Sequence, residues 1–129
     1  MHHLGLTVSD VERRARRYHD VLGFHEVGRV GDARDERRKI FLRHDDMSVR
    51  VGLVEHRGTT RTRFDEITPG LDHLSFAVPD RPELDRWCKR LADHGIDHSP
   101  VAAARSIPNA LVVVFRDPDD IQLELFLEE

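Results

Sequence analysis

A segment near the start of the chain, His-Leu-Gly-Leu-Thr-Val-Ser-Asp at residues 3–10, recurs as His-Leu-Ser-Phe-Ala-Val-Pro-Asp at residues 73–80. The His, Leu, Val and Asp positions match, and each copy continues through a helix-like stretch to a glycine, Gly23 in the first and Gly95 in the second. The chain is therefore built from two copies of one small module. Each copy has one histidine at the same place, which suggests a site shared between the halves.

Composition limits the classes of partner. The net charge is −4, with acidic and basic residues interspersed, which argues against a dedicated nucleic-acid or membrane surface. No apolar run approaches the roughly 20 residues that span a bilayer, and the N-terminus lacks the regions of a signal peptide. We therefore expect a cytoplasmic protein with a small-molecule partner. The single cysteine, Cys88, lies in an apolar helical pattern, which predicts a buried structural thiol.

The length suits one domain made of two modules. Each half has only about 65 residues, too few to be very stable alone, because small domains bury a small fraction of their surface. Residues 56–71 contain Gly, Thr, Arg and Pro with little periodicity and are the best linker candidate. We expect a single domain over 1–129, with module 1–55, linker 56–71 and module 72–129.

Hydrophobic patterning predicts a strand, a helix and three strands in the first module. Residues 3–8 alternate strictly, so the apolar side chains share one face, and His3 lies on the other face with two small residues. Asp10 is the expected helix N-cap, and Gly23 can supply the left-handed residue at the C-terminal end. The expected elements are a helix at 11–22 and strands at 3–8, 24–30, 39–43 and 47–54, with a charged loop at 31–38.

The second module repeats this order. A strand over 72–78 leads to Asp80 and to a helix over about 82–94, in which Glu83 can complete a capping box. Three strands follow, near 96–102, 110–116 and 121–127. The run Asp-Pro-Asp-Asp at 117–120 has the residues of a turn, so the last two strands are expected to form a hairpin.

Alternation along the final strand brings a carboxylate to the side of the histidines. The apolar residues of 121–127 share one face, and Glu124 projects from the other. His3, His73 and Glu124 are a sound ligand set for a divalent transition metal, and they leave coordination positions open for substrate, water or oxygen. Small residues beside the two histidines leave space above such a metal: Gly5, Thr7, Ser75 and Ala77.

Three motifs taken together resemble the vicinal oxygen chelate superfamily. They are His-x-x-Leu-x-Val-x-Asp at 3–10, its repeat at 73–80, and Asp-Pro-Asp-x-x-x-x-Glu-Leu at 117–125. This superfamily includes glyoxalase I, extradiol ring-cleaving dioxygenases, fosfomycin-resistance enzymes and bleomycin-resistance binding proteins. The resemblance covers essentially the whole chain. It implies an α+β fold in which two βαβββ modules form cupped mixed sheets around a central cavity.

The resemblance also implies a metal site. His3, His73 and Glu124 match the family's ligand positions for a divalent ion (Fe, Mn, Co, Ni or Zn), which substrates chelate through neighbouring oxygens. Many members have a fourth ligand on the last strand of the first module, as in glyoxalase I, where the carboxylate also exchanges the substrate's proton. Here that position is Gly52, which argues against an ordinary glyoxalase I. Glu55 could replace it only through a bulge.

Two functions stay open at this point. The first is a metal-dependent enzyme of lyase, isomerase or dioxygenase type, and the alternative is a non-catalytic protein that binds an antibiotic or metabolite in the same fold. Arg50 shares the predicted cavity side and could hold an anionic substrate group, although a solvated surface arginine explains it too. Phe126 could form an apolar wall or close the end of the sheet. We expect a homodimer, because paired modules expose sheet edges.

Overall fold

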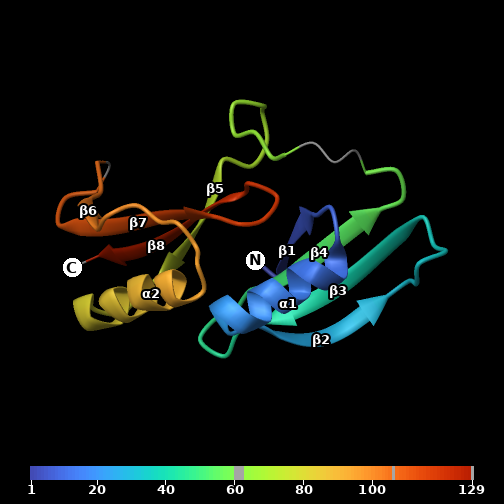
Figure 1. Cartoon of the computed structure of the whole chain (residues 1–129), viewed down its shortest axis with the longest axis horizontal. Coiled ribbons are helices and arrows are strands. Elements are labelled where there is room, and N and C mark those ends of the chain that lie inside the picture. Colours follow the sequence, from blue (N-terminus) through green and yellow to red (C-terminus); the bar gives the residue numbers. More distant parts are fainter. Residues whose placement is uncertain (60–62, 106, 129) are drawn as a thin grey trace. The chain divides into compact units, whose positions relative to one another are not determined.

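A computed structural model describes residues 1–59, 63–105 and 107–128 of the chain (Figure 1). The chain divides into two compact units, Met1–Thr62 and Arg63–Glu129. Each unit contains one helix and one four-stranded sheet, in the order strand, helix, three strands. The α+β fold class and the two βαβββ modules predicted from the repeat are confirmed.

In the first unit, the first and last strands pair with each other at one edge of the sheet. Its elements are β1 (His3–Thr7), α1 (Val11–Leu22), β2 (His25–Val30), β3 (Arg37–Arg43) and β4 (Arg50–His56). The strand order is β1-β4-β3-β2, with β1 parallel to β4 and the other pairs antiparallel. α1 packs on one face of this sheet. Apolar side chains between helix and sheet are almost fully buried: Leu6, Val8, Tyr18, Ile40, Leu42, Val51 and Leu53.

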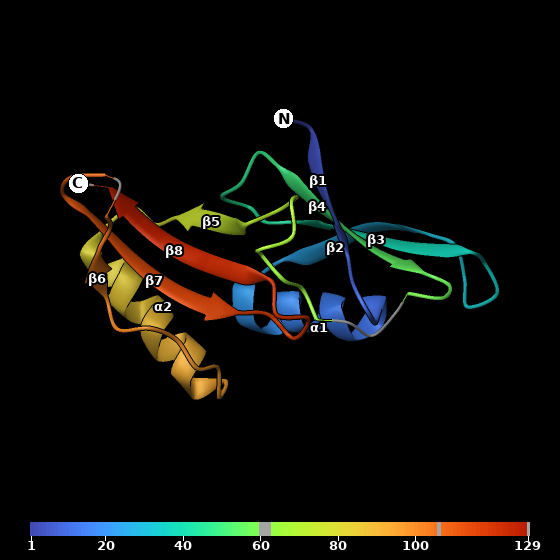
Figure 2. The ribbon, with the colours of Figure 1, turned by 90° about the horizontal axis from the view of Figure 1, so that it is seen from above.

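The second unit repeats this topology. Its elements are β5 (His73–Ala77), α2 (Arg81–Asp93), β6 (Ala102–Ala103), β7 (Ala110–Arg116) and β8 (Gln122–Glu128). The strand order is β5-β8-β7-β6, again with the first and last strands parallel. Figure 2 shows α2 lying along one side of β7 and β8. The buried side chains of this unit include Leu84, Leu91, Val113, Leu123 and Leu125.

An aspartate caps the N-terminus of each helix. Asp10 accepts a hydrogen bond from the Arg13 N–H at 2.9 Å, and Asp80 accepts one from the Glu83 N–H at 2.8 Å. Gly23 follows α1 with φ of 77°, a left-handed conformation that glycine adopts without steric cost. These caps satisfy backbone groups that a helix leaves unpaired at its ends, so the predicted boundaries of α1 hold.

The capping box predicted for the second helix is half formed. The backbone of Glu83 bonds to Asp80, but its carboxylate accepts from the Arg86 guanidinium instead of returning to the cap. On the same helix, Cys88 is half-buried, so the prediction of a buried thiol was too strong. Burial still raises the pKa of this thiol.

Strand boundaries differ from the sequence prediction in the first unit. β3 begins at Arg37, inside the predicted charged loop, because Arg38 pairs with Glu55 of β4 and the ladder continues through it. β4 begins at Arg50, later than the predicted start at residue 47. The linker expected over 56–71 includes residues 60–62, which lie outside the described residues.

The strand predicted over 96–102 is wrong in extent. It is reduced to one bridge between His98 and Phe115 and the two-residue β6. Pro100 has no N–H to donate to a ladder. The Ser99 hydroxyl accepts a hydrogen bond from the Val114 N–H at 2.9 Å instead. Neither helix of the described part of the chain is long and apolar enough to cross a membrane.

The N-cap of α1 offers a direct test of this architecture. Replacing Asp10 with Ala should lower the free energy of unfolding by about 1 kcal/mol, because the Arg13 N–H loses its partner. Asp10→Asn should lose much less, since Asn caps helices about as well as Asp. Urea denaturation of the three proteins measures the difference. Equal losses in both variants would show that the cap does not stabilise α1.

Candidate functional site

One face of the second sheet brings two of the predicted site residues together. The helix side of β8 carries buried leucines, and Glu124 lies on the other side, where β5 pairs Ser75 with Glu124 and His73 with Gln122. The Nε2 atom of His73 lies 3.5 Å from Oε2 of Glu124. The Glu124 side chain is only 15% exposed. The contact between this imidazole and this carboxylate confirms the geometry that alternation predicted for β8.

The neighbouring residue Asp72 fixes the orientation of the His73 ring. Its Oδ1 lies 2.5 Å from Nδ1 of His73. An imidazole that donates from Nδ1 to a carboxylate presents the lone pair of Nε2, which is the arrangement found at many metal-bound histidines. The pKa of His73 is raised, first by the hydrogen bond to Asp72 and also by the charge of Glu124, while burial opposes the rise. Nε2 is thus aimed at the carboxylate.

The distance between the two groups fits a shared metal ion. Divalent transition metals bind imidazole nitrogen and carboxylate oxygen at about 2.0–2.2 Å. Two such bonds at a near-tetrahedral angle place the ligand atoms about 3.4 Å apart, close to the observed 3.5 Å. Within each unit, no three His, Cys, Asp or Glu side chains of the described residues gather as a metal site. The second unit alone therefore offers a pair of ligands and not a full set.

A chain of polar contacts holds Glu124 from behind. Gln122 donates from Nε2 to Glu124 Oε1 at 3.3 Å, and its own oxygen lies 3.4 Å from the Arg116 guanidinium. Arg116 is anchored by Glu66 at 3.1 Å and by the Asp120 carbonyl at 2.7 Å. The hydrogen bond from the Arg116 guanidinium lowers the pKa of Glu66 to about 2. Such outer contacts orient a ligand and limit its motion.

The first sheet carries His3 in the position equivalent to His73. His3 lies on β1 opposite Arg50 of β4, and its Nδ1 lies 3.0 Å from Nδ1 of His2. The ring also meets Phe41 edge-on, with 6.4 Å between centroids. His2 therefore occupies in the first unit the place that Asp72 occupies in the second. The two histidines have the same register but different partners.

Strand register identifies the counterpart of Glu124. β1 pairs Gly5 with Gly52, and β5 pairs Ser75 with Glu124. Gly52 thus stands where the second unit has its carboxylate, at the position that the sequence analysis assigned to the missing fourth ligand. The Phe41 ring lies over it, 3.5 Å from the place of a Cβ. The first sheet has no acidic side chain at this point.

Glu55 does not substitute for the missing carboxylate. It accepts hydrogen bonds from the Arg38 guanidinium at 2.6 and 2.7 Å and from the Val11 N–H at 2.8 Å. Both charged side chains are about three-quarters covered, 25% exposed for Arg38 and 22% for Glu55. β4 has no bulge that would turn Glu55 to the face of His3. Its carboxylate joins β3, β4 and the first turn of α1.

The two substrate-binding candidates lie where parity predicted. Arg50 is exposed at the start of β4, next to His3 across the parallel pair. Phe126 lies on β8 between Ala77 and Val112, on the same face as Glu124. Their placement beside the proposed ligands is observed, and a role in binding is a separate proposal.

Comparison with known protein families identifies the superfamily of this chain. A sequence model of the Glyoxalase/Bleomycin resistance protein/Dioxygenase superfamily matches residues 1–125. The chain belongs to this superfamily. It is similar to the crystal structure of a glyoxylase/bleomycin resistance protein/dioxygenase domain from Frankia sp. EAN1pec, with 34% identity and a TM-score of 0.87 over 98% of this chain and 95% of that chain.

More distant structures share the superfamily fold. The fosfomycin resistance protein FosX from Listeria monocytogenes has 16% identity and a TM-score of 0.73, covering 100% of this chain and 93% of that chain. TnmS3, an antibiotic binding protein from Streptomyces sp. CB03234, has 18% identity and a TM-score of 0.70, covering 98% and 93%. These two likenesses show the fold alone. No curated protein matches the chain.

Sequence reasoning on this superfamily member missed the residues that support the ligands. Asp72 directly precedes His73, and that dipeptide could have indicated the orienting carboxylate. Gln122 and Arg116 gave no such signal, because their contacts depend on how β7 pairs with β8. The sequence of one strand does not show which residues of the paired strand will lie next to it.

Glu55 should be a stability residue and not a metal ligand. Glu55→Ala leaves Arg38 and the Val11 N–H without this partner, so it should lower the free energy of unfolding by about 2 kcal/mol. Glu36→Ala, at an exposed carboxylate, is the matched control and should change it little. Metal content of the folded Glu55→Ala protein should equal that of the wild type. Loss of metal in this variant alone would contradict the assignment.

The contact between Arg116 and Glu66 predicts a pH dependence. The carboxyl of Glu66 should titrate near 2 in the wild type and return toward 4.5 in Arg116→Gln. Because the folded pKa is depressed, the stabilisation is present above pH 4.5 and is lost as pH falls toward 2. The difference in unfolding free energy between the two proteins should therefore shrink over this window. NMR titration measures the pKa of Glu66, and acid denaturation measures the difference in unfolding free energy. A wild-type pKa of Glu66 near 4.5 would refute both expectations.

Proposed function

We propose that the protein holds a divalent metal through His3, His73 and Glu124 and acts on a small molecule that chelates the metal through neighbouring oxygens. The observation that carries this proposal is the approach of His73 Nε2 to Glu124 Oε2, with Asp72 on the other ring nitrogen. His3 is the third ligand because it occupies in the first repeat the place of His73 in the second. The donor set suits Fe, Mn, Co, Ni or Zn.

The chain's own residues prepare this site. When bound, the metal supplies Lewis acidity to the substrate oxygens. Asp72 keeps Nδ1 of His73 protonated and Nε2 available, and Gln122 restrains one oxygen of Glu124 while the other faces the histidine. Arg50 holds an anionic substrate group, and Phe126 supplies an apolar wall. Both residues lie on the same sheet faces as the proposed ligands.

β4 offers no carboxylate that could act as the general base of this chemistry. Gly52 stands at the position of Glu124, and Glu55 is engaged with Arg38 and α1. We therefore propose a reaction driven by polarisation of the bound substrate, of lyase, isomerase or dioxygenase type. A proton exchanged through a carboxylate of β4, as in glyoxalase I, has no side chain to carry it.

The same observation favours a second candidate, a binding protein without turnover. The face of the first sheet has no carboxylate at the position of Glu124, and a Cβ built on Gly5 would meet no atom within 4 Å. Such a face can hold a ligand without transforming it. An antibiotic or metabolite is the candidate ligand, as in TnmS3, which is an antibiotic binding protein of this fold. In either case we propose a homodimer, because edge strand β2 exposes Val27 and Val30.

Metal content tests the ligand assignment. Wild-type protein purified without added metal should hold nearly one equivalent of a divalent ion, measured by elemental analysis. His3→Ala, His73→Ala and Glu124→Ala should each lower the metal affinity by at least about tenfold, since one donor is lost. Glu128→Ala, on the same strand and face as Glu124, and His25→Ala are the matched controls and should keep the metal.

A wild type that stays metal-free after incubation with Fe, Mn, Ni and Zn salts would overturn the metal site. Equal metal content in Glu124→Ala and Glu128→Ala would overturn the role of Glu124. The binding-protein candidate predicts tight ligand binding that persists after chelation. Turnover of a bound compound only in the metal-loaded protein would decide for the enzyme.

A further inference from the structure

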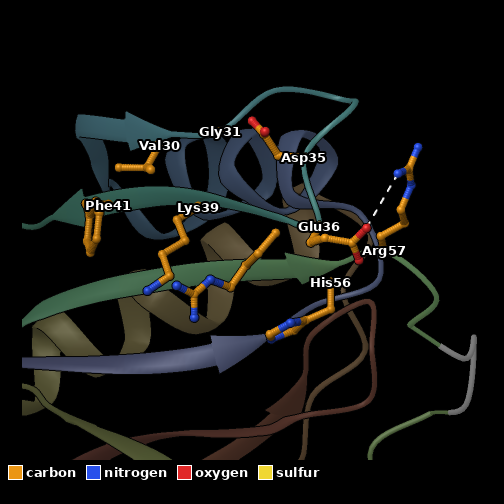
Figure 3. Close-up of a pocket in the computed structure, with 9 residues that line it drawn as sticks. Val30, Gly31, Asp35, Glu36, Lys39, Phe41, His56 and Arg57 are labelled. Carbon is orange, nitrogen blue, oxygen red and sulfur yellow. Dashed lines mark ion pairs between the residues drawn. The ribbon is translucent and has the colours of Figure 1, made fainter.

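The open face of the first sheet contains a hollow of about 760 Å³ (Figure 3). Residues of β2, β3, the end of β4 and the loop between β2 and β3 line it. Its volume is in the range of sites for small organic molecules, about 300–1,000 Å³. All lining residues belong to the first unit, and none of the proposed metal ligands is among them.

Four side chains of the adjacent strands β3 and β4 lie on the face of this hollow. β3 pairs Lys39 with Val54 and Phe41 with Gly52 of β4, so both side chains leave the sheet on the face opposite α1. Figure 3 shows Lys39 and Phe41 directed to the same side of β3, with His56 farther along, near the end of β4. Arg37 lies opposite His56 and shares this face. The hollow thus combines an aromatic ring with cationic side chains.

The acidic residues of the lining are already engaged. Glu36 lies 3.6 Å from the Arg57 guanidinium, and Asp35 accepts a hydrogen bond from the Asp32 N–H at 2.6 Å. Among the described residues, no carboxylate lies within ion-pair distance of Arg37 or Lys39. Two cations therefore face the hollow without a protein counter-charge.

The surrounding charge favours the same kind of ligand. Residues 1–62 contain 13 Lys and Arg against 10 Asp and Glu, whereas residues 63–129 contain 7 against 14. The chain as a whole is acidic at −4, but its first half is basic. The net positive charge of residues 1–62 and the two cations in the hollow, Arg37 and Lys39, both attract anions.

We propose that this hollow binds the oxyanion of a small organic acid whose apolar part lies against Phe41. Arg37 and Lys39 pair with the oxyanion, as guanidinium and ammonium groups do with carboxylates and phosphonates. The Phe41 ring continues the surface toward His3, whose ring it meets edge-on at 6.4 Å. The inference goes beyond the proposed function, because this acid is a ligand of the hollow and not the anionic substrate group assigned to Arg50, and the hollow itself needs no metal.

Calorimetric titration of the full chain, treated with EDTA, tests the site. Benzoate and phenylphosphonate are the ring-bearing acids, inorganic phosphate lacks the ring, and benzyl alcohol lacks the charge. Both acids should bind saturably, more tightly than phosphate, and benzyl alcohol should not bind. The tighter of the two acids identifies the oxyanion as a carboxylate or a phosphonate.

Variants locate the binding to the hollow. Arg37→Gln and Lys39→Gln should each weaken acid binding about tenfold, the loss expected for one charge-assisted hydrogen bond. Arg43→Gln is the matched control, on the same strand and face but outside the hollow, and should stay within about twofold of the wild type. Phe41→Leu should weaken benzoate and leave phosphate unchanged. Thermal unfolding confirms that each variant is folded.

The proposal fails if neither acid binds the wild type, or if Arg43→Gln weakens binding as much as Lys39→Gln. The second result would show a response to net charge alone. Metal content measured on the same variants separates this inference from the proposed function. Acid binding without any metal binding would support the anion site in the hollow and the binding-protein candidate. Metal binding without acid binding would refute the anion site and leave the proposed metal site standing.

Discussion

The parallel pairing of the first and last strands in each unit determines which side chains can meet. In the second unit this pairing sets His73 and Glu124 on one sheet face, two positions apart along the ladder. A slip of one residue in β8 would turn Glu124 toward α2 and bring a leucine to the histidine. The buried leucines of β8 oppose such a slip, because it would expose them to water. The hydrophobic core thus fixes the position of the polar pair.

The two repeats keep one backbone but have diverged in charge. The second has carboxylates around its histidine, with Asp72 on one ring nitrogen and Glu124 on the other. The first has Gly52 in place of that glutamate and gathers cations on the same face of its sheet. A duplicated module can divide its tasks in this way, because the fold needs only the helix-facing residues to remain apolar.

The sequence predicts the parts of the structure that depend on local patterns. Alternation, caps and the 117–120 turn locate α1, β7 and the side of Glu124, and the repeat identifies His73 as the partner of His3 in register. It does not predict features that depend on pairing between distant residues. β3 extends into a charged segment because a strand far along the chain supplies Glu55, and β6 is short because Pro100 interrupts a ladder. The hollow combines side chains of three strands, so no linear motif marks it.

Gly52 has a further meaning for the history of the chain. Its backbone is not in the left-handed region, and a Cβ there would meet the Phe41 ring at 3.5 Å, an ordinary van der Waals contact. The backbone therefore does not demand glycine at this position, and the first repeat can accept a Cβ there without a shift of its sheet. A glutamate at position 52 would give the proposed metal site a second carboxylate, as the counterpart of Glu124. One substitution on β4 thus separates a site with one carboxylate from a site with two, and a duplicated module can change its chemistry at this position.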